Sequence, residues 1–445
     1  MGKPPLVSLR EAKVSLIDCV HRTPPFAGVG YPYITIPDLK LGRIRHAEAR
    51  RISPEDYITW TQKAAPRPYD VVLSRRCNPG ETAVVPPGLE FALGQNLVLL
   101  RADGTKVFPP FLRWLVQGNE WWQEVRKFNN VGAVFDSLKC ADIPNFRLPI
   151  PSLPEQHTIA DVLCSLDEKI ELNRRMNETL EAMARAIFKS WFIDFDPVRA
   201  KAEGRQPYGM DAQTAALFPS DFQNSALGRI PKEWKVDHPN SFCGITIGGD
   251  WGEDVAFDGA VQVVCLRGVD LEHLRRDGYA GAPLRWVKPA SLARRALRDS
   301  DILIAASGIG PVGRSLRVVE TMQKQYGNPV TYSNFCKRLE VATPEHASYF
   351  DRWLYEMHRS NEIWEYVNGT SIPNLDANGL ISRMLIVIPP RSLLLKYHEF
   401  VAPVYARLFN QESQTLATIR DTLLPKLISG EIRIKDVEKM IVQEV

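Results

Sequence analysis

The sequence lacks a long hydrophobic run: no window approaches the roughly 18 uninterrupted apolar residues that a membrane-crossing helix needs. The first residues also lack the apolar core of a signal peptide. The seven cysteines are scattered and form no Cys-x-x-Cys pair. That pattern argues against a structural zinc site and is typical of reduced thiols in a cytosolic protein. These absences predict a cytoplasmic protein that binds no metal.

Motifs for catalysis and cofactor binding are missing as well. The chain has no Gly-x-x-x-x-Gly-Lys-Ser/Thr loop, no His-Glu-x-x-His pair and no Asn-Pro-Pro-Tyr/Phe tetrapeptide. The glycine-rich stretch 307–313 lacks the Lys-Ser/Thr ending, so we interpret it as a loop whose backbone could approach a DNA phosphate. Carboxylates followed by lysine, as in Asp167-Glu168-Lys169, fit a solvated helix face. We therefore predict no catalytic residue and no cofactor in this chain.

Charge and size set only broad limits. The chain has 445 residues, which predicts roughly two to four domains. Hydrophobic residues make up 44% and charged residues 24% of it, as in ordinary globular proteins. A net charge of +3 neither requires nor excludes nucleic acid, so local clusters of arginine and lysine are more informative.

The chain resembles itself at a spacing of roughly 230 to 240 residues. The matching pairs are Tyr33–Ile36 with Val263–Leu266, Tyr69–Leu73 with Ser300–Ile304, Arg113–Leu115 with Arg352–Leu354, and Leu148–Pro151 with Ile386–Pro389. Because the order is the same in both halves and the period far exceeds that of solenoid repeats, we interpret the pattern as two copies of a whole domain. The alternative is that short strands and aromatic helices look alike in any α+β protein.

Each copy is expected to contain small twisted sheets, because short β-branched runs alternate with Gly, Pro and Asn. Residues 109–127 and 347–367 are expected to be helices with tryptophans on the core face.

Residues 152–194 carry the clearest helical pattern. Ser152 with Glu155 forms a capping box, and Pro197 ends the helix. Between them, residues recur at alternating steps of four and three, which is typical of a coiled-coil seam. The seam comprises Ile159, Leu163, Leu166, Ile170, Asn173, Asn177, Leu180, Ala184, Ile187 and Trp191.

A second long helix is expected from about Ser392 to Ser429. Its seam comprises Tyr397, Val401, Val404, Leu408, Gln411 and Thr415, and then shifts to Ile419 and Leu423. Polar layers fall near the middle of both helices. Antiparallel packing would bring these layers together, which costs stability but fixes register. The alternative for each helix is an ordinary amphipathic helix on a globular core.

Long motifs in these regions resemble the specificity subunits of type I restriction–modification systems. Residues 150–198 share that family's Pro-x-x-Glu-Gln start, Leu-Asp-x-Lys-Ile centre and Phe-Lys-Ser-Trp-Phe end. Residues 211–236 are similar to its bridge into the second half, and residues 419–432 resemble its C-terminal helix. With the duplication, the resemblance covers essentially the whole chain.

The resemblance implies an α+β fold in which two pseudo-repeated target-recognition domains are separated by an antiparallel pair of long coiled-coil helices. The implied boundaries are 1–150 for the first recognition domain, 151–196 for the central helix, 197–235 for a linker, 236–388 for the second recognition domain, 389–432 for the C-terminal helix and 433–445 for a tail.

The resemblance also implies a function. Each recognition domain would read one half of a bipartite site on double-stranded DNA, with an unread spacer set by the helices. Two modification (methyltransferase) subunits and a restriction subunit would assemble with the chain, and S-adenosylmethionine and ATP would be bound by those partners. The alternatives are a stand-alone DNA methyltransferase or nuclease with a degenerate site, and a coiled-coil scaffold with no role on DNA.

Basic and amide side chains in loops are the candidate DNA contacts, because Arg can take guanine bidentately, Asn can take adenine, and Lys and Arg hold phosphates. The loops after the matching strands Tyr69–Leu73 and Ser300–Ile304 are favoured, since they occupy the same position in both copies. For any single Arg the alternative is a solvated surface charge. The candidates are Arg43, Arg45, Arg75, Arg76 and Asn78 in the first half, and Ser307, Arg314, Arg317, Lys324 and Asn334 in the second.

Overall fold

The computed structural model describes residues 3–131, 136–245, 248–369 and 371–432. The chain divides into two compact units. Unit 1 comprises Met1–Ile170 with Thr415–Val445, and unit 2 comprises Glu171–Gln414. The predicted tail 433–445 lies outside the described residues. None of the helices in the described ranges combines the length and the apolar character that crossing a membrane requires.

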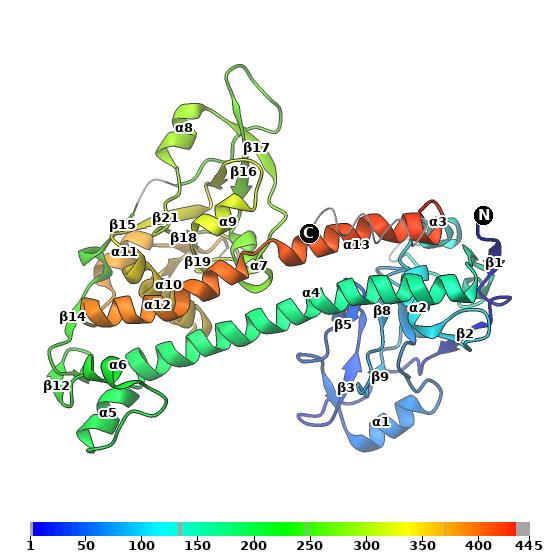
Figure 1. The fold of residues 1–445 in the computed structure, drawn as a ribbon, viewed down its shortest axis with the longest axis horizontal. Coiled ribbons are helices and arrows are strands. Elements are labelled where there is room, and N and C mark those ends of the chain that lie inside the picture. The colour runs from blue at the N-terminus through cyan, green and yellow to red at the C-terminus, as the bar shows by residue number, and fades with distance from the viewer. Residues whose placement is uncertain (1–2, 132–135, 246–247, 370, 433–445) are drawn as a thin grey trace. The chain divides into compact units, whose positions relative to one another are not determined.

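A four-stranded antiparallel sheet in the order β2-β10-β7-β8 is the centre of unit 1 (Figure 1). Its strands are β2 (Val14–Asp18), β10 (Leu97–Ala102), β7 (Val71–Ser74) and β8 (Thr82–Val84). Successive side chains of a strand point to opposite faces. Accordingly, Val71 and Leu73 join one buried cluster and Val72 joins another. Because both faces are covered, the strand is a continuous apolar run rather than an alternating one.

Shorter strands complete unit 1. They are β6 (Arg51–Ile52), β3 (Tyr31–Ile34) and β9 (Ala92–Leu93) in one sheet, β1 (Leu6–Ser8) paired with β11 (Arg147–Pro149), and β4 (Leu39–Lys40) paired with β5 (Arg43–Ile44). Strand β3 is antiparallel to β6 and parallel to β9.

Unit 2 repeats this topology. Its central sheet has the order β15-β21-β18-β19, its second sheet the order β17-β16-β20, and β14 pairs with β24. Each pair has the same direction as its counterpart in unit 1, including the parallel pair β16 and β20. The strands are β14 (Lys235–Asp237), β15 (Cys243–Ile245), β16 (Val261–Leu266), β17 (Leu284–Val287), β18 (Ile302–Ala305), β19 (Ser315–Arg317), β20 (Val330–Tyr332), β21 (Cys336–Val341) and β24 (Ile386–Ile388). The predicted duplication is therefore confirmed at the level of strand order and direction.

The two copies also start their central strand in the same way. The Asp70 carboxylate accepts the backbone N–H of Arg67 at 2.8 Å just before β7. The Asp301 carboxylate accepts the N–H of Arg298 at 2.8 Å just before β18. Both aspartates are buried, so each satisfies a turn donor that would otherwise be costly to bury.

The helices of the described chain are α1 (Pro54–Thr61), α2 (Pro109–Leu115), α3 (Asn119–Phe128), α4 (Leu153–Phe188), α5 (Asp196–Ala202), α6 (Ala212–Ala216), α7 (Gly268–Asp277), α8 (Pro289–Arg294), α9 (Glu320–Lys324), α10 (Pro344–Ser360), α11 (Ala377–Arg383), α12 (Arg391–Leu408) and α13 (Glu412–Ile428). Helix α4 spans 36 residues and continues into a π-helical turn at Lys189–Ile193. The Ser152 hydroxyl and backbone N–H both donate to Glu155, at 2.6 and 2.9 Å. The predicted helix 152–194 is thus confirmed, and of its capping box the bond from the Ser152 N–H to the Glu155 carboxylate is present.

The second long helix is not continuous, so the expectation of one helix from about Ser392 to Ser429 is wrong. Helices α12 and α13 are separated at Phe409–Gln411. The side-chain oxygen of Asn410 accepts the backbone N–H of Glu412 at 3.0 Å and caps the start of α13. This local bond competes with continued helix. Gln411, predicted in the seam, instead donates to the Lys324 carbonyl oxygen in unit 2 at 3.4 Å.

Within each unit, part of α4 packs against a C-terminal helix that runs the opposite way. In unit 1, Asp167 of α4 bonds Arg420 of α13, and the predicted seam residues Ile159, Leu163 and Leu166 are buried in one cluster with α13. In unit 2, Asn173 bonds Glu412, and Phe188 lies near Tyr397, with ring centroids 5.9 Å apart. Val401 and Leu408 are buried there, whereas Ile170, Leu180, Asn177 and Val404 are only half-buried.

Two other helical expectations need correction. Residues 109–127 form two helices, α2 and α3, and residues 347–367 end in a short 3-10 turn at Glu362–Tyr366. Trp114 and Trp121 face the core as expected, but Trp122 and Trp364 are exposed.

The predicted linker 197–235 is a folded part of unit 2. Its helices α5 and α6 and its hairpin of β12 (Phe222–Ser225) and β13 (Gly228–Pro231) bury Val198, Phe218 and Ile230 together with Trp234 in the unit 2 core. The amount of buried apolar surface explains why the segment is ordered despite its Pro, Gly and Asp content.

Candidate nucleic-acid interface

Four segments meet at one end of the central sheet of unit 1. We call this surface edge 1 and define it as residues 18–22, 75–79, 94–96 and 137–140. The Arg75 N–H donates to the Asn96 carbonyl oxygen at 3.0 Å, and the Leu138 N–H donates to the Arg75 carbonyl oxygen at 2.9 Å. These backbone bonds fix loops that are far apart in the sequence, so their side chains share one surface.

Unit 2 builds the equivalent surface with the same bonds. We call it edge 2 and define it as residues 248–250, 306–312, 333–335 and 372–375. The Ala306 N–H donates to the Phe335 carbonyl oxygen at 2.8 Å, and the Leu375 N–H donates to the Ala306 carbonyl oxygen at 2.8 Å. Arg75 therefore corresponds to Ala306, Asn96 to Phe335 and Leu138 to Leu375.

A glycine closes the same loop in each unit. The N–H of Gly80 bonds the Ser74 carbonyl oxygen, and that of Gly313 bonds the Ala305 carbonyl oxygen. Both have positive φ, 96° and 81°, a conformation that favours glycine. A Cβ on Gly80 would also lie 2.8 Å from Val125, and one on Gly313 2.8 Å from Ile363. The two loops thus begin and end with equivalent bonds, whereas loop 306–312 is longer than loop 75–79 and the residues that they present differ.

The predicted residues Arg75, Arg76 and Asn78 lie together on edge 1. Arg76 is exposed, Arg75 is half-buried and donates to the Leu138 carbonyl oxygen at 3.4 Å, and Asn78 donates to Glu81 at 3.2 Å. Ser307 and Asn334 lie on edge 2, where Asn334 is exposed. These five residues occupy positions from which DNA contact is feasible, and their role in contact stays a prediction.

The structure places the other predicted contacts elsewhere. Arg317 is wrong as a surface contact, because it is 2% exposed and donates to Ser348 at 2.6 Å. Arg314 forms an ion pair with Glu272. Arg43 lies 2.8 Å from Asp167 of α4. Lys324 is exposed on α9 and pairs with Glu320 at 2.8 Å, and Arg45 is exposed beyond β5. Clustering of arginines in the sequence does not separate those that pack inside the protein, as Arg317 does. The roles of Arg43, Arg45, Arg314 and Lys324 in DNA contact stay predictions.

Carboxylates on α4 bind arginines of neighbouring elements within each unit. Asp167 accepts Arg113 and Arg420, each at 2.8 Å, in addition to Arg43. In unit 2, Glu181 accepts Arg352, the counterpart of Arg113, at 2.9 Å. The duplicated arginines of the Arg-Trp-Leu motif are therefore positioning residues within the protein.

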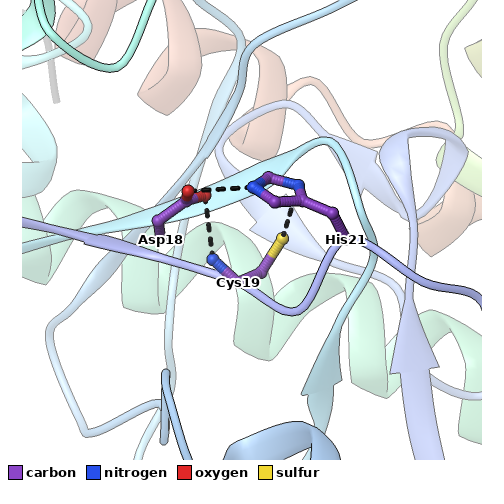
Figure 2. Close-up of side chains that lie close together, drawn as sticks. All are labelled: Asp18, Cys19 and His21. Carbon is purple, nitrogen blue, oxygen red and sulfur yellow. Dashed lines mark hydrogen bonds and ion pairs between the residues drawn. The ribbon is translucent and has the colours of Figure 1, made fainter.

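Edge 1 also contains a polar cluster that the sequence did not predict. Figure 2 shows Asp18, Cys19 and His21 at the end of β2. His21 Nε2 is 2.9 Å from Asp18 Oδ2, its Nδ1 is 2.9 Å from the Gln95 carbonyl oxygen, and Lys63 lies 3.6 Å from Asp18. Burial alone would raise the pKa of Asp18, but the bond and charge of His21 and the charges of Lys63 and Arg75 lower it overall.

This cluster has the residue types of a cation site, because its possible ligand atoms lie within 4.8 Å of one another. Both ring nitrogens of His21 already have partners, however, and burial raises the pKa of the Cys19 thiol to about 11. A protonated thiol and two neighbouring positive side chains are poor surroundings for a metal ion. We interpret the cluster as a hydrogen-bonded, cationic part of edge 1.

Sequence reasoning missed His21, Lys63 and Gln95, as well as Phe335 beside the predicted Asn334. The loops that bring them together are joined by backbone bonds across many residues of sequence, which local patterns do not reveal. The duplication carries a usable signal, since Asn96 and Phe335 follow matching strands.

The fold and the two edges together define a duplicated α+β protein. Its two similar units present different loop side chains on a similar scaffold. Residues 27–182 match the family model described as "Type I restriction modification DNA specificity domain". Over these residues the chain is similar to the specificity subunits of type I restriction–modification systems.

Individual specificity subunits are similar to this chain over longer stretches. The type I restriction enzyme MjaIX specificity subunit of Methanocaldococcus jannaschii is 27% identical over 326 residues, which cover 68% of this chain and 65% of that protein. The HindI specificity subunit of Haemophilus influenzae is 24% identical over 77% of this chain and 81% of its own. The crystal structure of a type I restriction–modification S subunit from M. genitalium has the same fold, with a TM-score of 0.57, 14% identity and 95% coverage of both chains.

Proposed function

We propose that this chain is the DNA sequence-recognition subunit of a type I restriction–modification complex. Edge 1 reads one half of a bipartite site on double-stranded DNA and edge 2 reads the other. One observation carries the proposal: the same hydrogen-bonded scaffold presents Arg75, Arg76 and Asn78 in unit 1 and Ala306, Ser307 and Ile309 in unit 2. A shared frame with different contact residues is what two half-sites of different sequence require.

Partner subunits supply the chemistry in this proposal. Two modification subunits bind S-adenosylmethionine and transfer methyl groups, and a restriction subunit binds ATP and cleaves. The present chain contributes recognition and assembly and holds neither cofactor nor metal. Because the DNA substrate is cellular, the complex acts in the cytoplasm.

A methylation assay tests the proposal. The purified chain, the modification subunit and their mixture are each incubated with genomic DNA and labelled S-adenosylmethionine, and the methylated bases are mapped. We expect methylation at one bipartite motif only in the mixture. Methyl transfer by the chain alone would favour a stand-alone methyltransferase. A mixture that methylates the same bases as the modification subunit alone would contradict a recognition role.

A further inference from the structure

We propose that edge 2 recognises thymine through an apolar patch formed by Ile309, Phe335 and Ile372. The proposal deepens the proposed function and rests on it. The three side chains contact the C5 methyl groups of thymine in the major groove of the half-site that unit 2 reads.

All three side chains of the patch are exposed to solvent. Ile309 is 78%, Phe335 57% and Ile372 62% exposed. Single exposed apolar residues are common, but exposed apolar residues that gather on one surface mark a binding site. The exposed apolar patch therefore indicates that a binding partner covers this surface.

Backbone bonds bring the three residues together from separate segments. Ala306, three residues before Ile309, donates to the Phe335 carbonyl oxygen at 2.8 Å. Gly308, next to Ile309, donates to the carbonyl oxygen of Pro373, next to Ile372, at 3.3 Å. The patch is consequently a fixed part of edge 2, although its residues span more than sixty positions of sequence.

Charge complementarity and the duplication favour DNA as the occupant. On the equivalent surface of unit 1, Arg76 is exposed, and Lys63 lies beside that surface, 3.6 Å from Asp18; both suit a polyanion. Edge 2 also has cations at its border: Arg295 donates to the Gly248 carbonyl oxygen at 3.0 Å, and the Lys337 ammonium lies beside Gly248. Two cations near one end of an apolar surface suit a base edge with a phosphate beside it.

The chemistry of the bases selects thymine. In the major groove, thymine alone among the four bases presents a methyl group, and apolar side chains are its natural partners. Exposed amides stand on the same edge, at Asn334 and Asn374, and an amide can pair with the adenine opposite thymine. Edge 2 is thus suited to A·T pairs, whereas Arg76 on edge 1 is suited to guanine.

The test combines substitutions in the protein with removal of the thymine methyl group. Three complexes of this chain with its modification subunit are prepared. The first contains wild-type chain, the second contains a triple variant with Ile309→Ser, Phe335→Ser and Ile372→Ser, and the third contains Leu227→Ser as a matched control. Leu227 is also exposed and apolar, but it lies in the β12–β13 turn. Affinities are measured for duplexes carrying the mapped motif, with thymine or deoxyuridine in each half in turn.

Deoxyuridine lacks only the methyl group, so it isolates the proposed contact. In one half of the motif, the change should weaken wild-type binding about 10-fold, the size of a typical single-position effect. The triple variant should be weakened about 10-fold on thymine DNA and should show no further loss on deoxyuridine. The Leu227→Ser control should behave as wild type, and the thermal midpoint of all three proteins should agree because the side chains are exposed.

Other outcomes would overturn the inference. One is a triple variant that distinguishes thymine from deoxyuridine as well as wild type does. Another is a unit 2 half-site without thymine on either strand. A third is a triple variant that fails to bind the modification subunit in the absence of DNA. The last result would assign the patch to a protein partner. Failure of the proposed function is a separate result, because the wild-type complex would then methylate at no defined motif.

Discussion

Asp167 is a residue of unit 1 on which three arginines converge. Its carboxylate is 5% exposed and lies within 2.8 Å of Arg43, Arg113 and Arg420. Burial alone would raise the pKa of Asp167, but the charges of Arg113, Arg43 and Arg420 outweigh burial and lower it. The ionised form is therefore the one that joins β5, α2 and α13 to α4.

We predict that Asp167→Asn lowers the free energy of unfolding of unit 1 by about 3 kcal/mol at neutral pH, because three arginines lose their shared counter-charge in a partly buried site. Urea unfolding of wild type, the variant and Asp161→Asn, an exposed control on the same helix, measures the effect. An Asp161→Asn protein destabilised as much as Asp167→Asn would contradict it.

The same variant has a defined pH dependence. A lowered folded-state pKa means that the contribution of Asp167 is present above the unfolded value, about 3.9, and is lost as the pH falls through the folded value. The difference in unfolding free energy between wild type and Asp167→Asn should therefore shrink as the pH falls below about 4. A difference that grows under these conditions would show that the ionised carboxylate is not the stabilising form.

Arg76 and Arg317 separate a binding role from a structural one. We predict that Arg76→Ala weakens DNA binding. If Arg76 contacts a phosphate, the slope of log affinity against log salt concentration should fall by about 1. The unfolding free energy should stay within about 0.5 kcal/mol of the wild-type value. Arg317→Ala should instead mainly lower stability, because Arg317 is buried beside Ser348. Salt titrations and urea unfolding of both variants test this, and identical behaviour of the two would refute it.

At the scale of elements, the meeting of α4 with the α12–α13 break is the most informative feature. Asn173 is buried and donates to Glu412 at 3.1 Å, and with Asn177, Arg407 and Asn410 it lines a small cavity within unit 2. The polar layer expected from the seam exists, with Glu412 rather than Gln411 as the bonded partner. A buried polar pair of this kind specifies register at a cost in stability.

We predict that Asn173→Leu changes the unfolding free energy by less than about 1 kcal/mol, because a lost hydrogen bond is offset by apolar burial. The spacing that the complex accepts between the two halves of its DNA motif should broaden. Methylation of duplexes with one base pair added to or removed from the spacer measures this. An unchanged spacing preference would leave Asn173 without a register role.

At the scale of the whole molecule, unit 1 is discontinuous in sequence and unit 2 is not. Helix α13 completes unit 1 by burying Leu423, Leu424, Leu427 and Ile428 against the start of α4. Each fully buried side chain of this size contributes roughly 1.5–3 kcal/mol. The C-terminal helix is therefore an integral part of the first unit, although it follows the second in the chain.

Truncation after Gln414 should destabilise unit 1 selectively. Hydrogen exchange should accelerate in α4 residues 153–170 and in β7, because their apolar partners are gone, while β18 and β21 keep their protection. Peptide-level exchange measured by mass spectrometry reports both regions in one experiment. Equal acceleration in both units would mean that they do not fold as separate cooperative bodies.

Features that depend on local spacing, or that emerge when the two halves are compared, can be predicted from the amino-acid sequence. The start of the long helix at Ser152 and Glu155 follows from local residue types, its length follows from periodicity, and the duplication follows from matching the two halves of the sequence. The family resemblance likewise follows from long continuous motifs.

The surroundings of individual side chains, the helix break and the apolar patch follow only from the tertiary structure, because these features depend on which distant groups meet. Packing settles whether an arginine faces solvent or a carboxylate of the same chain. Arg76 faces solvent, and Arg113 faces a carboxylate. The break at Asn410 was decided by one capping bond that heptad counting does not register. The apolar patch of Ile309, Phe335 and Ile372 exists only because backbone hydrogen bonds hold three separate loops at one edge.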